Sequence, residues 1–135
     1  MSFMNKERII QLPKIFDSRG SLSFFENNHQ IPFEIKRTYW IFDVPGGEKR
    51  GGHSFKNSNE FIVALSGSFD ILIDNGISKN KYSLNRSNYG LYVPNLLWRS
   101  IDNFSSNSIA LIVSSIPYTP DDYIFDFEEF KQLIR

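Results

Sequence analysis

The stretch Gly47–Gly67, GEKRGGHSFKNSNEFIVALSG, decides the fold of this 135-residue chain. Its spacing is Gly47-x5-His53-x-Phe55-x4-Glu60-x6-Gly67. An imidazole and a carboxylate in this pattern could meet at one metal ion, but such a site needs more ligands than these two. Because side chains alternate along a strand, Phe55 faces the same side as His53. The stretch therefore predicts a histidine facing the inside of a β-structure, with an incomplete set of metal ligands.

The same frame is similar to the first motif of the cupin β-barrels, G-x5-H-x-H-x3,4-E-x6-G, with Phe55 in place of the second histidine. A weaker second cupin pattern begins at Gly90-x3-Pro94 and continues to Arg99, where cupins usually carry histidine, and to the expected asparagine, Asn103. The resemblance implies an all-β fold, a cupin jelly-roll β-barrel. Only His53 and Glu60 remain of the four metal ligands, so we expect no bound metal.

The composition excludes several classes of protein. Fifteen basic and fifteen acidic residues balance, which leaves no electrostatic basis for binding nucleic acid or a membrane surface. Cysteine is absent, so disulfides, zinc–thiolate sites and thiol nucleophiles are excluded. No apolar run approaches the roughly 20 residues of a membrane span, and Met1–Arg8 lacks the apolar core of a signal peptide. We expect a single cytoplasmic domain, residues 1–135.

Short β-type runs recur along the chain, and phenylalanine is common, with 13 residues, which favours strands over helices. The expected strands are Ile9–Phe16, Ser21–Glu26, Ile35–Val44, Glu60–Ser66, Ser68–Asp74, Lys79–Leu84, Gly90–Val93, Leu97–Asn103 and Ile109–Ser115. Turn residues separate them, and Asn75-Gly76 predicts a two-residue hairpin because both positions tolerate a positive φ. Strands at this spacing indicate a sandwich or a closed barrel.

The C-terminal end has a different pattern. Thr119-Pro120-Asp121-Asp122 combines a capping hydroxyl, a proline and two acids, which predicts the start of a helix. Phe127, Phe130, Leu133 and Ile134 then recur at helical spacing. We expect a short C-terminal helix that packs on the outside of the barrel without a catalytic role.

Seven segments resemble the dTDP-4-keto-6-deoxyglucose 3,4-ketoisomerases, and they occur in that family's order from about Ile10 to Ile134. The segments are Asp17–Leu22, Ile31–Phe42, Arg50–His53, Leu65–Ser68, Gly90–Val93, Leu97–Arg99 and Asp121–Ile124. The resemblance implies an isomerase of deoxyamino-sugar biosynthesis that acts on a dTDP-linked 4-keto-6-deoxy sugar. It also implies a homodimer, with neither nucleic acid nor a membrane as partner.

The chemistry of such an isomerase can be stated from first principles. A base takes the proton from C3, an enediolate forms, and a proton is delivered to C4. Imidazole suits this task because its pKa of about 6.5 lets it accept and donate near neutral pH. A fixed cation or hydroxyl would stabilise the enediolate oxygens. We predict His53 as the base and expect no cofactor.

Phe55 departs from the family pattern, which usually has a second histidine there, and three interpretations follow. His53 alone transfers the protons, or another group such as Tyr39 or Tyr92 replaces the lost imidazole, or the activity is lost or changed. The third interpretation describes a non-catalytic nucleotide-sugar-binding cupin or an epimerase acting at C3.

The resemblance also implies roles for several charged residues. Arg99 stands where relatives carry histidine or arginine, and arginine accompanies the gluco product. Arg19 matches the relatives that form the galacto product, so the C4 epimer stays open.

A diphosphate needs cations, and we expect Arg37 and Arg50 to supply them. Alternation along Ile35–Phe42 predicts that Arg37, Tyr39 and Ile41 share one face. Glu60 is expected either to orient His53 or to pair with a neighbouring cation.

Overall fold

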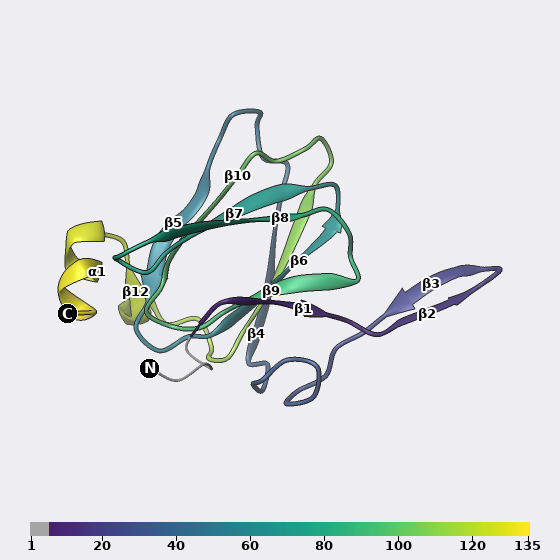
Figure 1. Ribbon diagram of the computed structural model, residues 1–135, viewed down its shortest axis with the longest axis horizontal. Coiled ribbons are helices and arrows are strands. Elements are labelled where there is room, and N and C mark those ends of the chain that lie inside the picture. The colour runs from purple at the N-terminus through teal and green to yellow at the C-terminus, as the bar shows by residue number, and fades with distance from the viewer. Residues whose placement is uncertain (1–5) are drawn as a thin grey trace.

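The computed structural model describes residues 6–135, which form two five-stranded sheets and a separate two-stranded hairpin (Figure 1). The first sheet has the order β1 (Arg8–Gln11), β9 (Tyr89–Val93), β6 (Glu60–Ser66), β11 (Ile109–Ser114), β4 (Arg37–Phe42). The second has the order β12 (Tyr123–Ile124), β5 (Arg50–Phe55), β10 (Trp98–Asp102), β7 (Phe69–Asp74), β8 (Lys79–Leu84). The hairpin pairs β2 (Lys14–Asp17) with β3 (Gly20–Ser23). The predicted all-β class is confirmed, and the sheets form a jelly-roll-like sandwich.

The main core lies between the two sheets. Ile62 and Ile112 face inward from the first sheet, Ile71 and Ile101 face inward from the second, and all four are fully buried. Each such side chain contributes roughly 1.5–3 kcal/mol by leaving water. A second cluster, on the outer face of the first sheet, includes Phe61, Val63 and Tyr92 beneath Ile31 and Phe33. Alternation along each strand therefore separates an inner face from an outer one.

Several local predictions differ from the structure. The run Ile9–Phe16 is divided into β1 and β2 at Pro13, which has no N–H for a ladder hydrogen bond. Strand β5 was not among the expected strands, and its Gly51-Gly52 pair gives little strand signal. The turn after Asp74 is a four-residue loop and not the predicted two-residue hairpin. The side-chain oxygen of Asn75 stabilises this loop by accepting hydrogen bonds from the backbone N–H groups of Ile77 and Ser78.

The short C-terminal helix is confirmed, but its predicted start is wrong. Helix α1 covers Phe127–Leu133 and is capped by Asp126, whereas Pro120–Asp122 forms only a 3-10 turn. Both Asp122 carboxylate oxygens are occupied elsewhere, accepting from the Asn57 and Ser58 backbone N–H groups and from the Ser58 hydroxyl. These bonds fix the chain so that β12 pairs with β5 before the helix begins.

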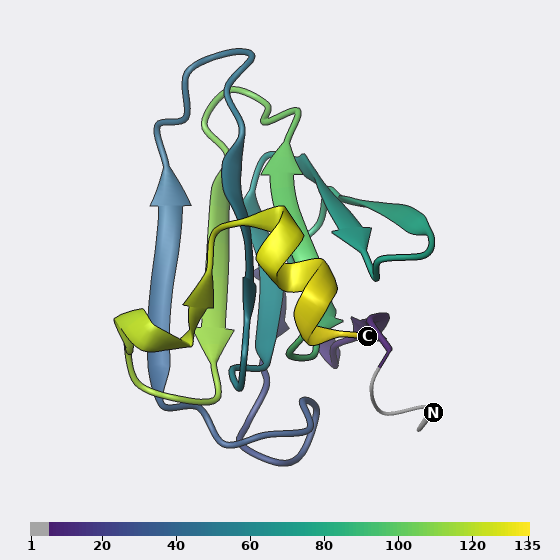
Figure 2. The ribbon, with the colours of Figure 1, turned by 90° about the vertical axis from the view of Figure 1, so that its left-hand side faces the viewer.

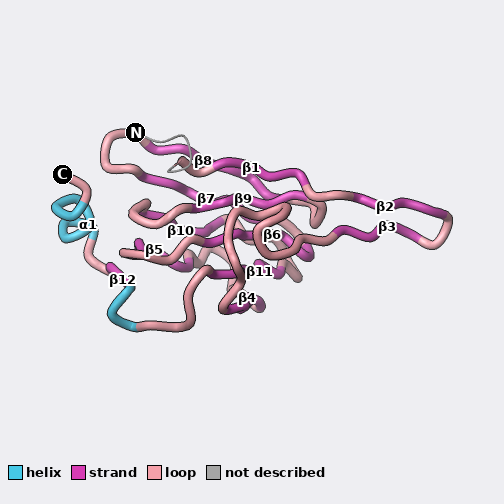
Figure 3. The backbone as a smooth tube through the Cα atoms, turned by 90° about the horizontal axis from the view of Figure 1, so that it is seen from below, coloured by secondary structure: helices cyan, strands magenta, loops and turns pink. Residues whose placement is uncertain are grey.

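Helix α1 covers the outer face of the second sheet (Figure 2). There the Trp98 ring packs 5.3 Å from Phe127 and 5.8 Å from Phe130. The β2–β3 hairpin projects from the opposite end of the molecule (Figures 1 and 3). None of the helices in residues 6–135 has the length and apolar character needed to cross a membrane.

Candidate functional site

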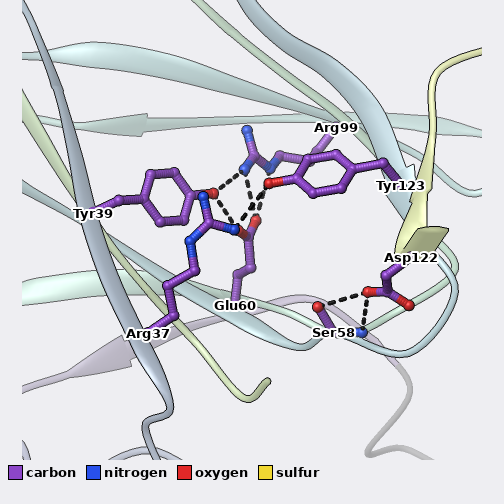
Figure 4. Close-up of polar contacts among 7 residues, drawn as sticks. All are labelled: Arg37, Tyr39, Ser58, Glu60, Arg99, Asp122 and Tyr123. Atoms are coloured by element: carbon purple, nitrogen blue, oxygen red, sulfur yellow. Dashed lines mark hydrogen bonds and ion pairs between the residues drawn. The ribbon is translucent and has the colours of Figure 1, made fainter. Parts of the chain in front are cut away.

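Three polar side chains meet between the sheets, one each from β4, β6 and β10 (Figure 4). Arg99 donates from Nε and Nη2 to Glu60 Oε1 at 2.9 and 2.7 Å. Arg99 Nη2 also donates to the Tyr39 hydroxyl at 2.9 Å, and Tyr39 donates its own hydrogen to Glu60 Oε2. Arg99 and Glu60 are each 1% exposed. The structure therefore brings together three predicted site residues in one buried network.

Charge compensation explains why this network tolerates burial. Burial opposes the charged form of Arg99, but Glu60 and Tyr39 outweigh it and raise the pKa of Arg99. Burial is also the main reason why the pKa of Tyr39 is raised, and Glu60 adds to it against the effect of Arg99. A phenol with a raised pKa whose hydrogen is held by a carboxylate is a poor proton donor.

His53 lies beside this network and is 7% exposed. It is the Cα partner of Arg99 where β5 pairs with β10. Burial, followed by the charges of Arg99 and Arg37, lowers the pKa of His53 to about 3. The imidazole is therefore neutral at physiological pH and can accept a proton.

Glu60 accepts hydrogen bonds from Arg99 and Tyr39, so of the two roles expected for it the structure shows the second, pairing with a cation. Within residues 6–135, no three His, Cys, Asp or Glu side chains are grouped closely enough to hold a metal ion. Metal independence nevertheless stays a prediction, because it concerns the protein in solution.

Two buried polar atoms in this region have no hydrogen-bond partner in the described part of the chain, His53 Nε2 and Arg99 Nη1. Both residues border Gly51, which has φ +69°. A Cβ atom on Gly51 would lie 2.3 Å from Arg99 Nη1 and 3.5 Å from His53 Cε1. Buried polar groups in proteins are almost always satisfied, so these two atoms stand out as groups that still lack a partner.

Aromatic rings surround the other side of His53. Its ring centroid lies 4.7 Å from Phe55, 5.2 Å from Tyr123 and 5.9 Å from Phe125. The Phe55 and Tyr123 rings are themselves 4.7 Å apart, and Tyr123 stacks on Phe125. Phe55 is thus a packed member of an aromatic cluster.

Arg37 is the second cation near the histidine. Its guanidinium carbon lies 4.3 Å from the centroid of the Tyr39 ring and 4.8 Å from that of Tyr118. Arg37 Nη1 donates to the Tyr123 hydroxyl at 2.9 Å. In Figure 4 the hydroxyls of Tyr39 and Tyr123 point toward each other across Arg37. The predicted inward face of β4 agrees with the burial pattern, in which Arg37, Tyr39 and Ile41 are the less exposed residues.

Arg50, the other predicted diphosphate contact, does not lie next to Arg37. It is exposed at the start of β5 and borders a surface groove with Lys49, Trp40 and Phe42. Arg37 begins β4, whereas Phe42 ends it, so the two predicted diphosphate contacts lie toward opposite ends of that strand.

Two other predicted site residues lie away from His53. Tyr92 faces the second hydrophobic cluster, on the outer face of the first sheet, because it alternates with inward-facing Leu91 and Val93. Arg19 is in the turn of the projecting hairpin, where it is 88% exposed and pairs with Asp17 at 2.6 Å. Within one chain, neither can act beside His53.

Sequence reasoning did not assign a role to Tyr118, Tyr123 or Phe125. A signal was present, since Asp121–Ile124 is one of the family-like segments. Only the β12–β5 pairing, with Tyr123 opposite Phe55, shows that this segment borders the site.

Comparisons with known proteins identify the family of the chain. The family model described as "FdtA: WxcM-like, C-terminal" matches residues 5–135. A curated relative, TDP-4-oxo-6-deoxy-alpha-D-glucose-3,4-oxoisomerase of Aneurinibacillus thermoaerophilus, is 39% identical over 129 residues, which cover 96% of this chain and 93% of the relative.

Two solved structures have the same fold and recognisable sequence similarity. WlaRB, a TDP-quinovose 3,4-ketoisomerase from Campylobacter jejuni, is 40% identical with a TM-score of 0.90 over 93% of this chain and 97% of its own. A mutant of the 3,4-ketoisomerase QdtA from Thermoanaerobacterium thermosaccharolyticum, in complex with TDP-4-keto-6-deoxyglucose, is 30% identical with a TM-score of 0.93 over 99% and 96%.

Proposed function

The chain belongs to the family FdtA (WxcM-like, C-terminal), and on that premise we propose that it is a dTDP-4-keto-6-deoxyhexose 3,4-ketoisomerase. The reaction is an intramolecular oxidation and reduction, in which the keto group moves from C4 to C3 through an enediol or enediolate. The named relatives carry out 3,4-ketoisomerisation of TDP-sugars. We expect the reaction to take place in the cytoplasm without a cofactor.

The observation that carries the proposal is a buried imidazole whose Nε2 atom has no hydrogen-bond partner in residues 6–135. His53 takes the proton from C3, which is acidic because it lies next to the C4 ketone. The resulting imidazolium exchanges its proton with solvent and delivers a proton to C4. One residue thus serves both carbon atoms, and nothing else is consumed.

Arg99 supplies the positive charge that the enediolate requires. Its Nε and Nη2 atoms are occupied by Glu60, whereas Nη1 is unpartnered and borders the same glycine as His53. A donor aimed at the developing negative charge, and already held in position, stabilises the transition state without reorganisation. Glu60 is a positioning residue in this mechanism, because it acts through Arg99.

The anionic substrate also explains how a histidine with such a low pKa can act as a base. In the free protein Arg37 and Arg99 both disfavour the imidazolium. A bound diphosphate and a developing enediolate bring negative charge to these cations and raise the proton affinity of His53 when it is needed. Arg50 is exposed and makes no ion pair with any residue from 6 to 135, so we assign it to the diphosphate.

A homodimer is part of the proposal. The β2–β3 hairpin projects from the sheets (Figure 1) and exposes Ile15, Phe16 and Leu22. Trp40 and Phe42 are also more than half exposed, on the outer face of the edge strand β4. Apolar surface of this kind is normally covered in a stable protein. A second copy that receives the hairpin would cover it and could bring Arg19 to a site of the partner.

The test is proton exchange at the substrate carbon. In deuterium oxide, the wild type is expected to convert dTDP-4-keto-6-deoxyglucose to a 3-keto product and to exchange the proton at C3, as followed by NMR. His53→Asn keeps a polar side chain but cannot exchange protons near pH 7, so exchange and product should both be lost while dTDP still binds.

Three outcomes would contradict the assignment. Wild-type protein that binds dTDP but gives neither exchange nor product is a binding module. Exchange at C3 with the keto group still at C4, and inversion at C3, identifies an epimerase. Full exchange in His53→Asn moves the base to another residue.

A further inference from the structure

The ketoisomerase reaction needs a second proton transfer, because one hydrogen must leave O3 and another must reach O4. The cupin frame would supply a second imidazole at position 55, but this chain has Phe55. The group next to it in space is Tyr123, the Cα partner of Phe55 in the β12–β5 pairing. We infer that Tyr123 carries this oxygen-to-oxygen proton transfer. The inference rests on the proposed function and adds a catalytic residue to it.

Of the two tyrosines whose hydroxyls make hydrogen bonds at the site, Tyr123 is favoured over Tyr39. Tyr39 gives its hydroxyl hydrogen to the Glu60 carboxylate and accepts from Arg99, so it has no hydrogen to offer. Tyr123 only accepts, from Arg37 Nη1 at 2.9 Å. Within residues 6–135 no acceptor takes the hydroxyl hydrogen of Tyr123. That hydrogen is available to an oxygen of the substrate.

Arg37 makes proton loss from Tyr123 feasible. Its guanidinium is held between the rings of Tyr39 and Tyr118, so its position is set before a ligand arrives. When Tyr123 gives up its proton, the phenolate oxygen keeps a charge-assisted hydrogen bond from Arg37, and such bonds are about twice as strong as neutral ones. Arg37 is thereby also a positioning residue for Tyr123.

Tyr123 and His53 also lie close enough together to act on one substrate molecule. Their ring centroids are 5.2 Å apart, and the Tyr123 hydroxyl points toward the buried network that includes Arg99 (Figure 4). A sugar ring that offers C3 to His53 and its oxygens to Arg99 would present O3 and O4 to the hydroxyl of Tyr123.

The protons balance in this scheme. His53 removes the C3 proton as the Tyr123 proton passes to O4, which gives an enediol, an imidazolium and a phenolate. The phenolate takes the O3 proton as the imidazolium protonates C4, which gives the 3-keto sugar. Both residues end in their starting states, and no oxidant or reductant is required.

Tyr123→Phe tests this role, because it removes one oxygen and keeps the ring against Phe55 and Phe125. General acid–base catalysis contributes about 10²–10⁴-fold, so product formation should fall at least about 100-fold. Exchange at C3 in deuterium oxide should fall much less, because His53 still removes that proton and returns deuterium to C3 when O4 is not protonated. Affinity for dTDP, measured by calorimetry, should change by less than about threefold.

Tyr89→Phe is the matched control. Its hydroxyl also makes hydrogen bonds, to Ser83 and Asn85, but these lie outside the site. The Tyr89→Phe variant should keep the wild-type ratio between the rate of deuterium exchange at C3 and the rate of product formation.

Two results would overturn the inference while leaving the proposed function intact. In the first, Tyr123→Phe forms product at the wild-type rate. In the second, exchange, product and dTDP affinity fall together, which identifies a structural role. Wild-type protein that forms no 3-keto sugar overturns the proposed function itself, and the role of Tyr123 with it.

Discussion

At the scale of single residues, Glu60 shows how a metal-ligand position can be used for another purpose. The sequence frame presents it as one of four cupin ligands, but its oxygens accept from Arg99 and Tyr39. Removing one partner of a buried ion pair typically costs about 3–5 kcal/mol, because the other charge is left uncompensated. Glu60 therefore holds Arg99 in position, and the charge of Arg99 adds to burial, the larger cause, in lowering the pKa of His53.

The neutral state of His53 makes stability depend on pH. Its pKa is about 3 in the folded protein, against about 6.5 in an unfolded chain. As pH falls below about 6.5, His53 becomes protonated in the unfolded state but stays neutral in the folded state. The free energy of unfolding therefore decreases as the pH is lowered, down to about pH 3. The loss approaches about 1.4 kcal/mol per pH unit.

Urea unfolding between pH 7 and pH 4 checks this, with His53→Asn as the variant that cannot titrate. The wild type should lose more stability on acidification than His53→Asn does, because the carboxylates titrate equally in both proteins and only the wild type has a titrating group at residue 53. Parallel pH profiles would mean that the pKa of His53 is the same in the folded and unfolded states.

At the scale of elements, β5 is the strand on which the site depends. It pairs with β10 through His53 and Arg99, and with β12 through Phe55 and Tyr123. The short β12 is anchored from the other side by Asp122, whose carboxylate accepts from the Ser58 hydroxyl at 2.7 Å. The C-terminal segment therefore contributes to the site, although α1 itself lies outside the sheets.

Gly51 in β5 should not tolerate a side chain. Its φ of +69° is strained for alanine, and the added Cβ would lie 2.3 Å from Arg99 Nη1. Gly51→Ala is expected to cost about 1–3 kcal/mol in the free energy of unfolding, and to lower kcat by displacing Arg99. Urea unfolding and isomerase assays measure the two effects.

Gly46→Ala is the control, because a Cβ at Gly46 would meet nothing within 4 Å. It should leave both stability and kcat near the wild type. Equal behaviour of the two alanine variants would show that Arg99 is not held against Gly51.

At the scale of the whole molecule, the projecting β2–β3 hairpin is the feature that a single chain does not explain. It carries Phe16, which is 74% exposed, together with Ile15 and Leu22. If a second copy covers these side chains, a charge among them should prevent assembly, because burying an unpaired charge is costly.

Phe16→Glu is therefore expected to convert a dimer to a monomer in sedimentation experiments. Ile77→Glu is the control, since Ile77 is 95% exposed in the β7–β8 loop, far from the hairpin in sequence. It should leave the dimer intact. A monomeric wild type, or a dimer in both variants, would contradict the proposed use of the hairpin.

The sequence by itself determined much of the fold, because the relevant signals are local. The bounds of β6 and β8 follow from apolar runs and turn residues, and they agree with the expected Glu60–Ser66 and Lys79–Leu84. Alternation along β4 likewise predicts the inward face of Arg37 and Tyr39. The cupin frame and the family resemblance identified His53 before any contact was known.

Only the tertiary structure decided how these residues are combined. Whether Glu60 meets His53 or Arg99 depends on how three strands from different parts of the chain are paired, and so does the position of Tyr123 opposite Phe55. Tyr92 and Arg19 illustrate the same point, since both are suitable residues that the topology places away from the histidine. Strand register across the sheets is set by long-range packing, and no local sequence pattern contains that information.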